Sequence, residues 1–331
     1  MTEPSSAFLT GGSGLVGGHL LARLTASGTS VSALVRSQSA QRKVTEYGAE
    51  PVRGDLFDVD GLARAMRGAS VVFHVAGVND TCPRDVAAMD RVNIEGTRSV
   101  IAAAASAGVE RVVYTSSAAA IGEHRGTIGT EVTVHCGEYP SPYARSKHLA
   151  EIAAFDEAAG QGIDLVALNP SSVQGPGRSS GSAEILLRVL NAKRPILIDT
   201  NLSIVDIEDC TTGHIRAAAH GVAGERYLLS GASVSVADAV AVASSIVGRE
   251  VTPRWASERV VRVLGIPAAR ALSRVRPSSG ICPALVRTLL HGHTFDGAKA
   301  ERDLGLVYHP IEDTFRRTID WFLAEGLLEA R

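Results

Sequence analysis

The sequence has little of several features that mark particular classes of protein. Its 331 residues include 33 basic and 35 acidic side chains and carry a formal net charge of −2, so no basic excess is available for nucleic acid or an anionic membrane. No apolar run reaches the roughly 18 residues that a membrane-spanning helix needs. The N-terminus, Met1 to Pro4, shows no part of a signal peptide. We therefore expect a cytoplasmic protein whose partner is a small molecule, with no nucleic acid and no membrane as partner.

Cysteine and aromatic residues are also scarce. The cysteines contain no C-x-x-C pair and have no histidine at the spacing of a zinc site. We expect four reduced thiols, no disulfide framework and no metal. Aromatic residues make up 5% of the chain while 45% of the residues are hydrophobic, a balance that suits helices packed on a parallel sheet. The four cysteines are Cys82, Cys136, Cys210 and Cys282.

Glycine, by contrast, is concentrated in one stretch near the N-terminus. An apolar strand ends at Leu9 and apolar residues recur at helical spacing from Leu15, so the chain must turn between them. Gly12, Gly14 and Gly17 match the dinucleotide fingerprint, and the helix N-terminus that follows favours phosphate. A glycine-rich loop without a ligand is the alternative. The predicted cofactor contacts of this stretch are Thr10, Gly11, Gly12, Ser13, Gly14, Leu15, Val16 and Gly17.

Strands and helices alternate after this turn. Continuous apolar runs predict buried strands, and helical patterns fill the intervals between them. The pattern indicates an α/β fold with a doubly wound parallel sheet, in which ligands bind at the carboxyl ends of the strands. Ala76 and Gly77, which end one strand, are therefore predicted cofactor contacts. The expected strands after the first are residues 30–35, 49–53, 71–76, 111–115 and 163–168.

Arg36 ends the second strand, about 20 residues past the fingerprint, where an acidic residue would bind the ribose of NAD. An arginine there can pair with a 2′-phosphate, and Arg42 and Lys43 follow closely. We predict NADP as cofactor, with NAD disfavoured. A solvated surface arginine is the alternative. Asp55, after the third strand, could be the N-cap of the next helix.

Tyr143 and Lys147 lie four residues apart on one face of a helix that Pro142 opens. A free tyrosine has a pKa of about 10, and a neighbouring ammonium favours its phenolate. Asn93 and Gly96 fall within a helix expected over 84–107, although both residue types oppose helix formation. We expect Asn93 to bond backbone or a water near the active site.

Glycine, serine and proline interrupt the pattern after Ser171 and mark a change of organisation. We expect a cofactor domain over 1–173 and a smaller, mostly helical substrate-binding region over 174–331. Segments around 195–231 are expected to return partly to the cofactor domain.

These motifs occur in the order typical of one family. The chain resembles the extended short-chain dehydrogenase/reductase superfamily, and within it the dihydroflavonol reductase-like and NAD-dependent epimerase/dehydratase group. The motifs that carry the resemblance are Thr10-Gly-x-x-Gly14-x-x-Gly17, Asp55, Asn93-x-x-Gly96-Thr97, Ser116-Ser117-Ala118, Tyr143-x-x-x-Lys147, Pro170-x-x-Val173-x-Gly175-Pro176 and Lys299-Ala300-x-x-x-Leu304-Gly305.

The resemblance implies roles for individual residues. Tyr143 would donate a proton, Lys147 would tune it and bind the nicotinamide ribose, and Ser117 rather than Ser116 would bind the substrate oxygen. Asn93 is a weaker candidate for holding a relay water. The resemblance also implies a homodimer formed through helices that include the one after Tyr143. Further cofactor contacts follow at Asp55, near the adenine, and at Leu56, Pro170, Ser172 and Val173.

The favoured function is an oxidoreductase that passes a hydride between NADP and a small, hydrophobic carbonyl or alcohol. One alternative is an NAD-dependent sugar-nucleotide epimerase or dehydratase. Ile121 and Gln174 stand where such enzymes carry aromatic residues, which weakens that alternative. Another is a dinucleotide-sensing protein without turnover, against which the Tyr143 and Lys147 pair counts.

Overall fold

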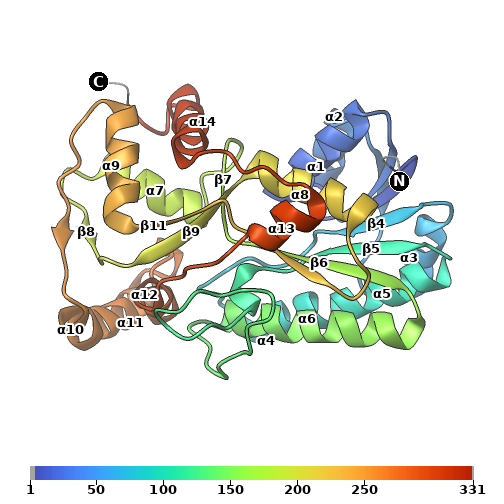
Figure 1. The fold of residues 1–331 in the computed structure, drawn as a ribbon, viewed down its shortest axis with the longest axis horizontal. Helices are drawn as coiled ribbons and strands as arrows, with labels where there is room; N and C mark the ends of the chain where they lie inside the picture. The colour runs from blue at the N-terminus through green and yellow to red at the C-terminus, as the bar shows by residue number, and fades with distance from the viewer. Residues whose placement is uncertain (1–3, 330–331) are drawn as a thin grey trace.

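The computed structural model describes residues 4–329. Figure 1 shows a larger part built on a twisted sheet with helices on both faces, and a smaller part beside it that later residues form. The larger part carries the glycine turn, and the smaller part lies beyond the ends of several of its strands.

Seven strands of the described chain form one parallel sheet. Its neighbours follow the order β10-β6-β5-β4-β1-β2-β3, so the order reverses at β1, between β4 and β2. This confirms the predicted doubly wound α/β fold, in which ligands bind beside the reversal. The strands are β1 (Ser6–Thr10), β2 (Ser30–Val35), β3 (Glu50–Arg53), β4 (Val71–His74), β5 (Arg111–Thr115), β6 (Asp164–Pro170) and β10 (Arg226–Leu229).

Helices cover both faces of this sheet because its strands are apolar on both faces. Phe8 and Leu9 of β1 are fully buried in opposite clusters, as successive strand residues must be. Fully burying a side chain of this size contributes about 1.5–3 kcal/mol. One face carries α1 (Leu15–Ala26), α2 (Gln38–Glu46) and α8 (Ile207–His220), and the other carries α3 (Val59–Met66), α5 (Gly96–Ser106) and α6 (Pro142–Gln161).

The helix expected over 84–107 is divided. It consists of α4 (Val86–Asp90), a π-helical turn over Arg91–Glu95 and α5. Asn93 lies in the π-helical turn and is 2% exposed. Such turns are frequent at functional sites, and this one directs a polar side chain toward the loop after β4.

The smaller part contains more strand than expected. β11 (Ala232–Ser235), β9 (Asn201–Asp206) and β7 (Ser172–Gln174) form a second sheet, and β8 (Ile196–Leu197) pairs with β12 (Arg254–Trp255). Helices α7, α9 and α14 pack beside the second sheet around Phe315, Ile319 and Phe322. The helices of this part are α7 (Ser182–Asn191), α9 (Val236–Val247), α10 (Glu258–Val260), α11 (Ile266–Val275), α12 (Pro283–His291), α13 (Ala298–Leu304) and α14 (Ile311–Ala324).

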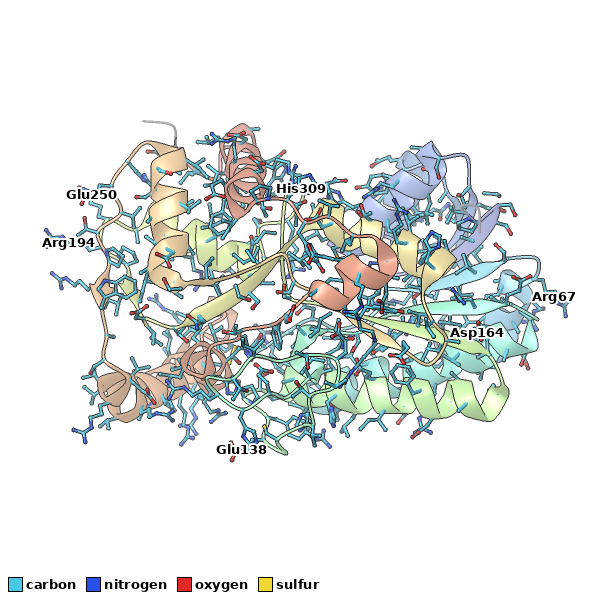
Figure 2. All side chains as sticks on the ribbon, in the orientation of Figure 1. Arg67, Glu138, Asp164, Arg194, Glu250 and His309 are labelled. Atoms are coloured by element: carbon cyan, nitrogen blue, oxygen red, sulfur yellow. A yellow bond between two sulfur atoms is a disulfide. The ribbon has the colours of Figure 1, made fainter. Side chains whose placement is uncertain are left out.

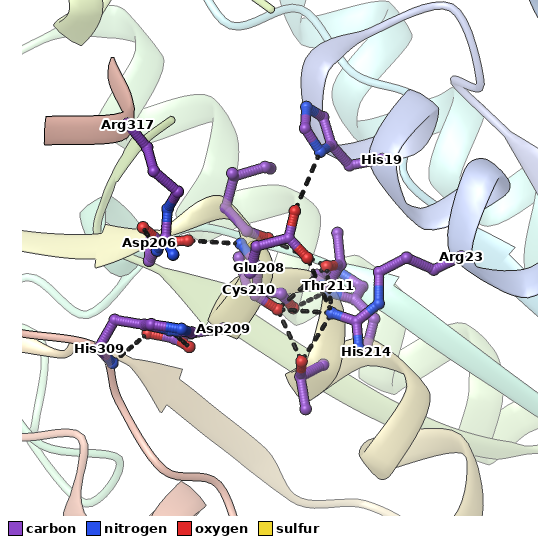
Figure 3. A network of polar contacts seen from close by, with 12 residues as sticks. His19, Arg23, Asp206, Glu208, Asp209, Cys210, Thr211, His214, His309 and Arg317 are labelled. Carbon is purple, nitrogen blue, oxygen red and sulfur yellow. Dashed lines mark hydrogen bonds and ion pairs between the residues drawn. The ribbon is translucent and has the colours of Figure 1, made fainter. Parts of the chain in front are cut away.

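A network of polar contacts around α8 joins the two parts (Figure 3). Arg23 of α1 lies 3.5 Å from the Glu208 carboxylate and donates to the Glu208 carbonyl at 2.8 Å. Arg317 of α14 donates to Asp206, whose fully buried side chain caps α8. Because α8 packs on the parallel sheet, these contacts tie α14 of the smaller part to the larger one.

The expectation of four reduced thiols is wrong. Cys82, in the loop after β4, forms a disulfide with Cys282, which directly precedes α12. The two are separated by 200 residues, so only the tertiary fold brings them together. Cys136 and Cys210 are free.

Charged side chains lie on the outside of both parts. Figure 2 shows Arg67 at the rim of the larger part and Arg194 and Glu250 at the outer edge of the smaller one. Among the described residues, no helix combines the length and the apolar character needed to cross a membrane.

Candidate active site

The glycine turn is closed by contacts that leave no room for side chains. Gly11 has φ +80°, and a Cβ there would lie 2.6 Å from the Ala76 backbone nitrogen. A Cβ at Gly17 would lie 2.7 Å from the Gly11 carbonyl carbon and closer still to its oxygen. Gly14 is the N-cap of α1 with no side-chain cap, and Ser13 and Gly14 are exposed. The first amides of α1 are therefore open to an anion.

The end of β4 lies against this turn. The Ala76 amide donates to the Thr10 hydroxyl at 3.2 Å, and a hydrogen bond of 2.8 Å joins that hydroxyl to His74. Burial and, to a smaller extent, the charge of Lys147 together lower the pKa of His74 to about 3. His74 is thus a neutral, packed histidine. Gly77 follows at the open edge, and a Cβ there would lie 3.9 Å from Lys147 Nζ.

Asn93 holds the loop after β4. Its side-chain oxygen accepts from the Val78 amide at 2.7 Å, and its side-chain nitrogen donates to the Val78 carbonyl at 3.1 Å. The same nitrogen donates to Ser146 of α6 at 3.0 Å. The predicted bond to backbone is present, so Asn93 connects the loop beyond Gly77 to the helix that carries Tyr143.

Tyr143 lies in the first turn of α6, and Ser141 caps that helix by accepting from the Ala144 amide. Burial raises the pKa of Tyr143, whereas the nearby Ser117 hydroxyl and the positive charge of Arg178 act in the opposite direction. Ser117 caps the short helical turn that follows β5. The structure therefore brings the predicted Ser117 and Tyr143 together, and adds Arg178, which the sequence did not single out.

Lys147 is one turn further along α6 and is 6% exposed. Its ammonium donates to the Thr115 carbonyl at 2.8 Å and to the Tyr114 hydroxyl at 3.4 Å. Burial lowers the pKa of Lys147 to about 8, against the opposing charge of Glu151. The side chain is therefore charged at neutral pH, close to the deprotonation point.

Arg36 and Asp55 lie at the neighbouring ends of β2 and β3, away from Tyr143. Arg36 is exposed. Asp55 does not cap α3; its carboxylate accepts from the Phe57 amide at 3.1 Å, and Asp58 is the cap. Leu56 is 4% exposed and packs against the position of Gly96.

Pro170 ends β6, while Ser172 and Val173 lie in β7 of the second sheet. The loop beyond them returns to the glycine turn, because a hydrogen bond of 3.1 Å joins His19 of α1 to the Pro176 carbonyl. These predicted contacts therefore lie where the two parts meet. Arg178 comes from the same loop. The glycine- and serine-rich sequence of that loop gave no indication that Arg178 lies near Tyr143.

Comparisons with known proteins agree with this arrangement. A family model described as the NAD dependent epimerase/dehydratase family matches residues 7–230. The chain is 33% identical to a putative dihydroflavonol 4-reductase of Synechocystis sp., over 98% of this chain and 96% of that protein. It is 33% identical to a 4-hydroxy-2-methyl-3-oxo-4-farnesyl-3,4-dihydroquinoline-1-oxide ketoreductase of Stigmatella aurantiaca, over 67% of each. The crystal structure of gox2253 superposes with a TM-score of 0.84 at 29% identity, over 98% of this chain and 100% of that chain.

Proposed function

Because the chain belongs to the NAD-dependent epimerase/dehydratase family of extended short-chain dehydrogenases/reductases, we propose that it is an NADP-dependent ketone or aldehyde reductase, or the corresponding alcohol dehydrogenase. The substrate we propose is a small, hydrophobic carbonyl compound or alcohol. The observation that carries the proposal is the grouping of Tyr143, whose side chain lies near Ser117 and Arg178, with Lys147 one helical turn further along α6. Ser117 follows the carboxyl end of β5, and the Lys147 ammonium donates to Thr115 at that same end, which is where ligands bind in such sheets.

A bound NADPH would supply a hydride to the carbonyl carbon. Tyr143 would give its phenolic proton to the carbonyl oxygen, so that hydride and proton together make the alcohol. Burial, which raises the pKa of Tyr143, keeps this proton in place at neutral pH before reaction. Ser117 would donate a hydrogen bond to the same oxygen and orient it.

The phenolate left on Tyr143 requires positive charge nearby. The positive charge of Arg178 already lowers the pKa of Tyr143. Lys147, which lies in α6 as Tyr143 does, would supply a second cation. Lys147 lies beside Gly77, where the nicotinamide ribose would be held, so one ammonium would serve binding and proton transfer. Asn93 would act by fixing the loop beyond Gly77, with the relay water as its weaker role.

The cofactor preference rests on Arg36. Its exposed guanidinium stands at the end of β2, and Arg42 and Lys43 of α2 add positive charge close by. A 2′-phosphate would pair with this charge. Arg36→Asp removes the partner and adds repulsion, so we expect NADPH affinity to fall by at least about tenfold while NADH affinity does not. Cofactor fluorescence titrations measure both, and equal affinities in the unmodified protein would contradict the preference.

Tyr143→Phe tests the catalytic assignment, because it removes only the hydroxyl. With a panel of ketones and aldehydes and NADPH absorbance as readout, turnover should fall at least about 100-fold while NADPH binding persists. Ser117→Ala should impair turnover less, and Lys147→Ala should impair both turnover and binding.

Tyr139→Phe is the matched control, since Tyr139 is 37% exposed in the loop before α6. Full activity in Tyr143→Phe would show that the motif has no catalytic role. If the protein instead binds NAD tightly and turns over a nucleotide sugar, the epimerase or dehydratase would be favoured. Cofactor binding without turnover of any substrate would favour a dinucleotide sensor.

The remaining proposals concern organisation. We propose that residues 1–173 hold the cofactor and 174–331 the substrate, with β10 and α8 serving the cofactor part because β10 joins its sheet and α8 packs on that sheet. We also propose a homodimer through α6, on the resemblance to the extended short-chain dehydrogenases/reductases alone. Light scattering of the purified protein tests the dimer.

A further inference from the structure

A second cluster of polar side chains lies outside the site of Tyr143. Glu123 comes from the loop that follows β5, His291 is the last residue of α12, and His293 lies two residues further. They are brought together because the His293 amide donates to the Asn201 carbonyl at 2.9 Å, which holds this segment along β9. The three belong to both parts of the molecule.

Their donor atoms converge on one point. Glu123 Oε1 lies 2.6 Å from His293 Nδ1 and 3.6 Å from His291 Nε2, and the three donor atoms all lie within 4.8 Å of one another. Around a tetrahedral ion with bonds of about 2.0–2.1 Å, neighbouring donors are separated by about 3.3 Å. The observed spacing therefore needs changes of no more than about 1.5 Å in the distances between donor atoms to accept an ion.

The carboxylate is buried beside two imidazoles. Glu123 is 2% exposed, and a buried carboxylate needs partners, which here are His293 at 2.6 Å and His291 at 3.6 Å. The side chains of His291 and His293 are 19% and 23% exposed. An ion therefore has a route from solvent to the buried carboxylate oxygen.

Two imidazole nitrogens and one carboxylate oxygen suit Zn²⁺ and related first-row metals, whereas Mg²⁺ and Ca²⁺ prefer oxygen ligands. We propose that Glu123, His291 and His293 bind one divalent transition-metal ion, of which Zn²⁺ fits the donor set best. The ion takes the position of the proton between Glu123 and His293, and the neutral His293 then carries its proton on the other ring nitrogen. Three protein ligands leave a fourth position for water.

The position of this site gives the ion a structural consequence. Ile121, two residues before Glu123, packs with Ala118 and with Phe295, two residues after His293. The ion would therefore clamp the segment that starts at Ser117 to the end of α12. It lies outside the proposed proton transfer, and its binding does not depend on that proposal.

Zinc alone is the probe. Protein treated with EDTA and dialysed is titrated with Zn²⁺ by calorimetry, and Co²⁺ provides a visible absorption band for a site with two imidazole ligands. We expect one site of micromolar affinity or tighter, no comparable site for Mg²⁺, and a loss of at least about 100-fold in His291→Ala and in Glu123→Gln. The melting temperature of the unmodified protein should rise with Zn²⁺.

His309→Ala is the matched control, because His309 pairs with the buried carboxylate of Asp209 at 2.5 Å in the same manner. Among residues 4–329 that pair is not part of a group of three such ligands. His309→Ala should therefore bind Zn²⁺ as the unmodified protein does. His291→Gln decides the question if the alanine variant does not fold. Binding that is undiminished in folded His291 variants, or no binding below about 100 μM, would overturn the proposal.

Discussion

Replacing Gly17 by alanine adds only one methyl group, but it should disrupt the glycine turn. The added Cβ would lie 2.7 Å from the Gly11 carbonyl carbon, whereas unstrained carbon contacts begin at about 3.5 Å. Both groups are backbone, so neither can rotate away. The start of α1 and the end of β1 would have to separate by roughly 1 Å, which would also displace the amides proposed to bind the cofactor phosphates.

The magnitude follows from two opposing terms. Alanine stabilises a helix interior by about 1 kcal/mol over glycine, and overpacking costs about 1–3 kcal/mol, with rigid backbone at the upper end. We expect Gly17→Ala to lose about 2 kcal/mol. Gly18→Ala is the matched control: its Cβ would meet Tyr47 at 3.2 Å, and that ring is 39% exposed and free to move. The control should be neutral or up to about 1 kcal/mol more stable.

Urea unfolding followed by circular dichroism measures both variants, and cofactor fluorescence measures binding. Gly17→Ala should lose NADPH binding even where it is folded, and Gly18→Ala should retain it. If both variants unfold at the same urea concentration and bind cofactor equally, the close approach of Gly17 to Gly11 is wrong.

Two further predictions concern Lys147 and the disulfide. The Lys147 pKa of about 8 lies below its ordinary value of 10.5, so NADPH affinity and turnover should decline above pH 8. Between pH 8 and 10.5 Lys147 is protonated in the unfolded chain and deprotonated in the folded one, so the free energy of unfolding should rise with pH. In urea titrations Lys147→Met should lack this pH dependence. A thiol titration of the denatured, unreduced protein should detect two thiols, Cys136 and Cys210. After reduction it should detect four. Reduction should cost about 2–4 kcal/mol of stability; four thiols before reduction would contradict the bond.

The parallel sheet could be predicted because its signals are local. β2 and β5 have the predicted bounds, and α9 begins and ends where the apolar pattern does. β7 and β11 were missed because both are short and contain serine. They exist through pairing with β9, at Ser172↔Ile204 and Ala232↔Ile204, and sequence periodicity carries no record of such pairing.

The site divides in the same way. Thr10, Ala76 and Ser117 follow from strand ends, whose position in a parallel sheet is fixed by topology. Asp55 was proposed as a cap, and Asp58 is the cap, because two aspartates precede the same helix and only the chain path chooses between them. His291 and His293 are two residues apart, which is apparent in the sequence. Glu123, the carboxylate that joins them, lies far away in the sequence, so only the fold shows the group of three.

The electrostatic setting of Lys147 crosses the boundary between the two halves of the chain. Glu151, 3% exposed, opposes the effect of burial on the pKa of Lys147. Its carboxylate accepts from Arg226 of β10 at 2.8 Å and from Asn169 of β6 at 2.5 Å. A buried carboxylate without such partners would be costly. Strand β10, although it comes after the second sheet begins, therefore supplies a partner to the carboxylate that acts on Lys147, and a cofactor half cut at residue 173 would lack that partner.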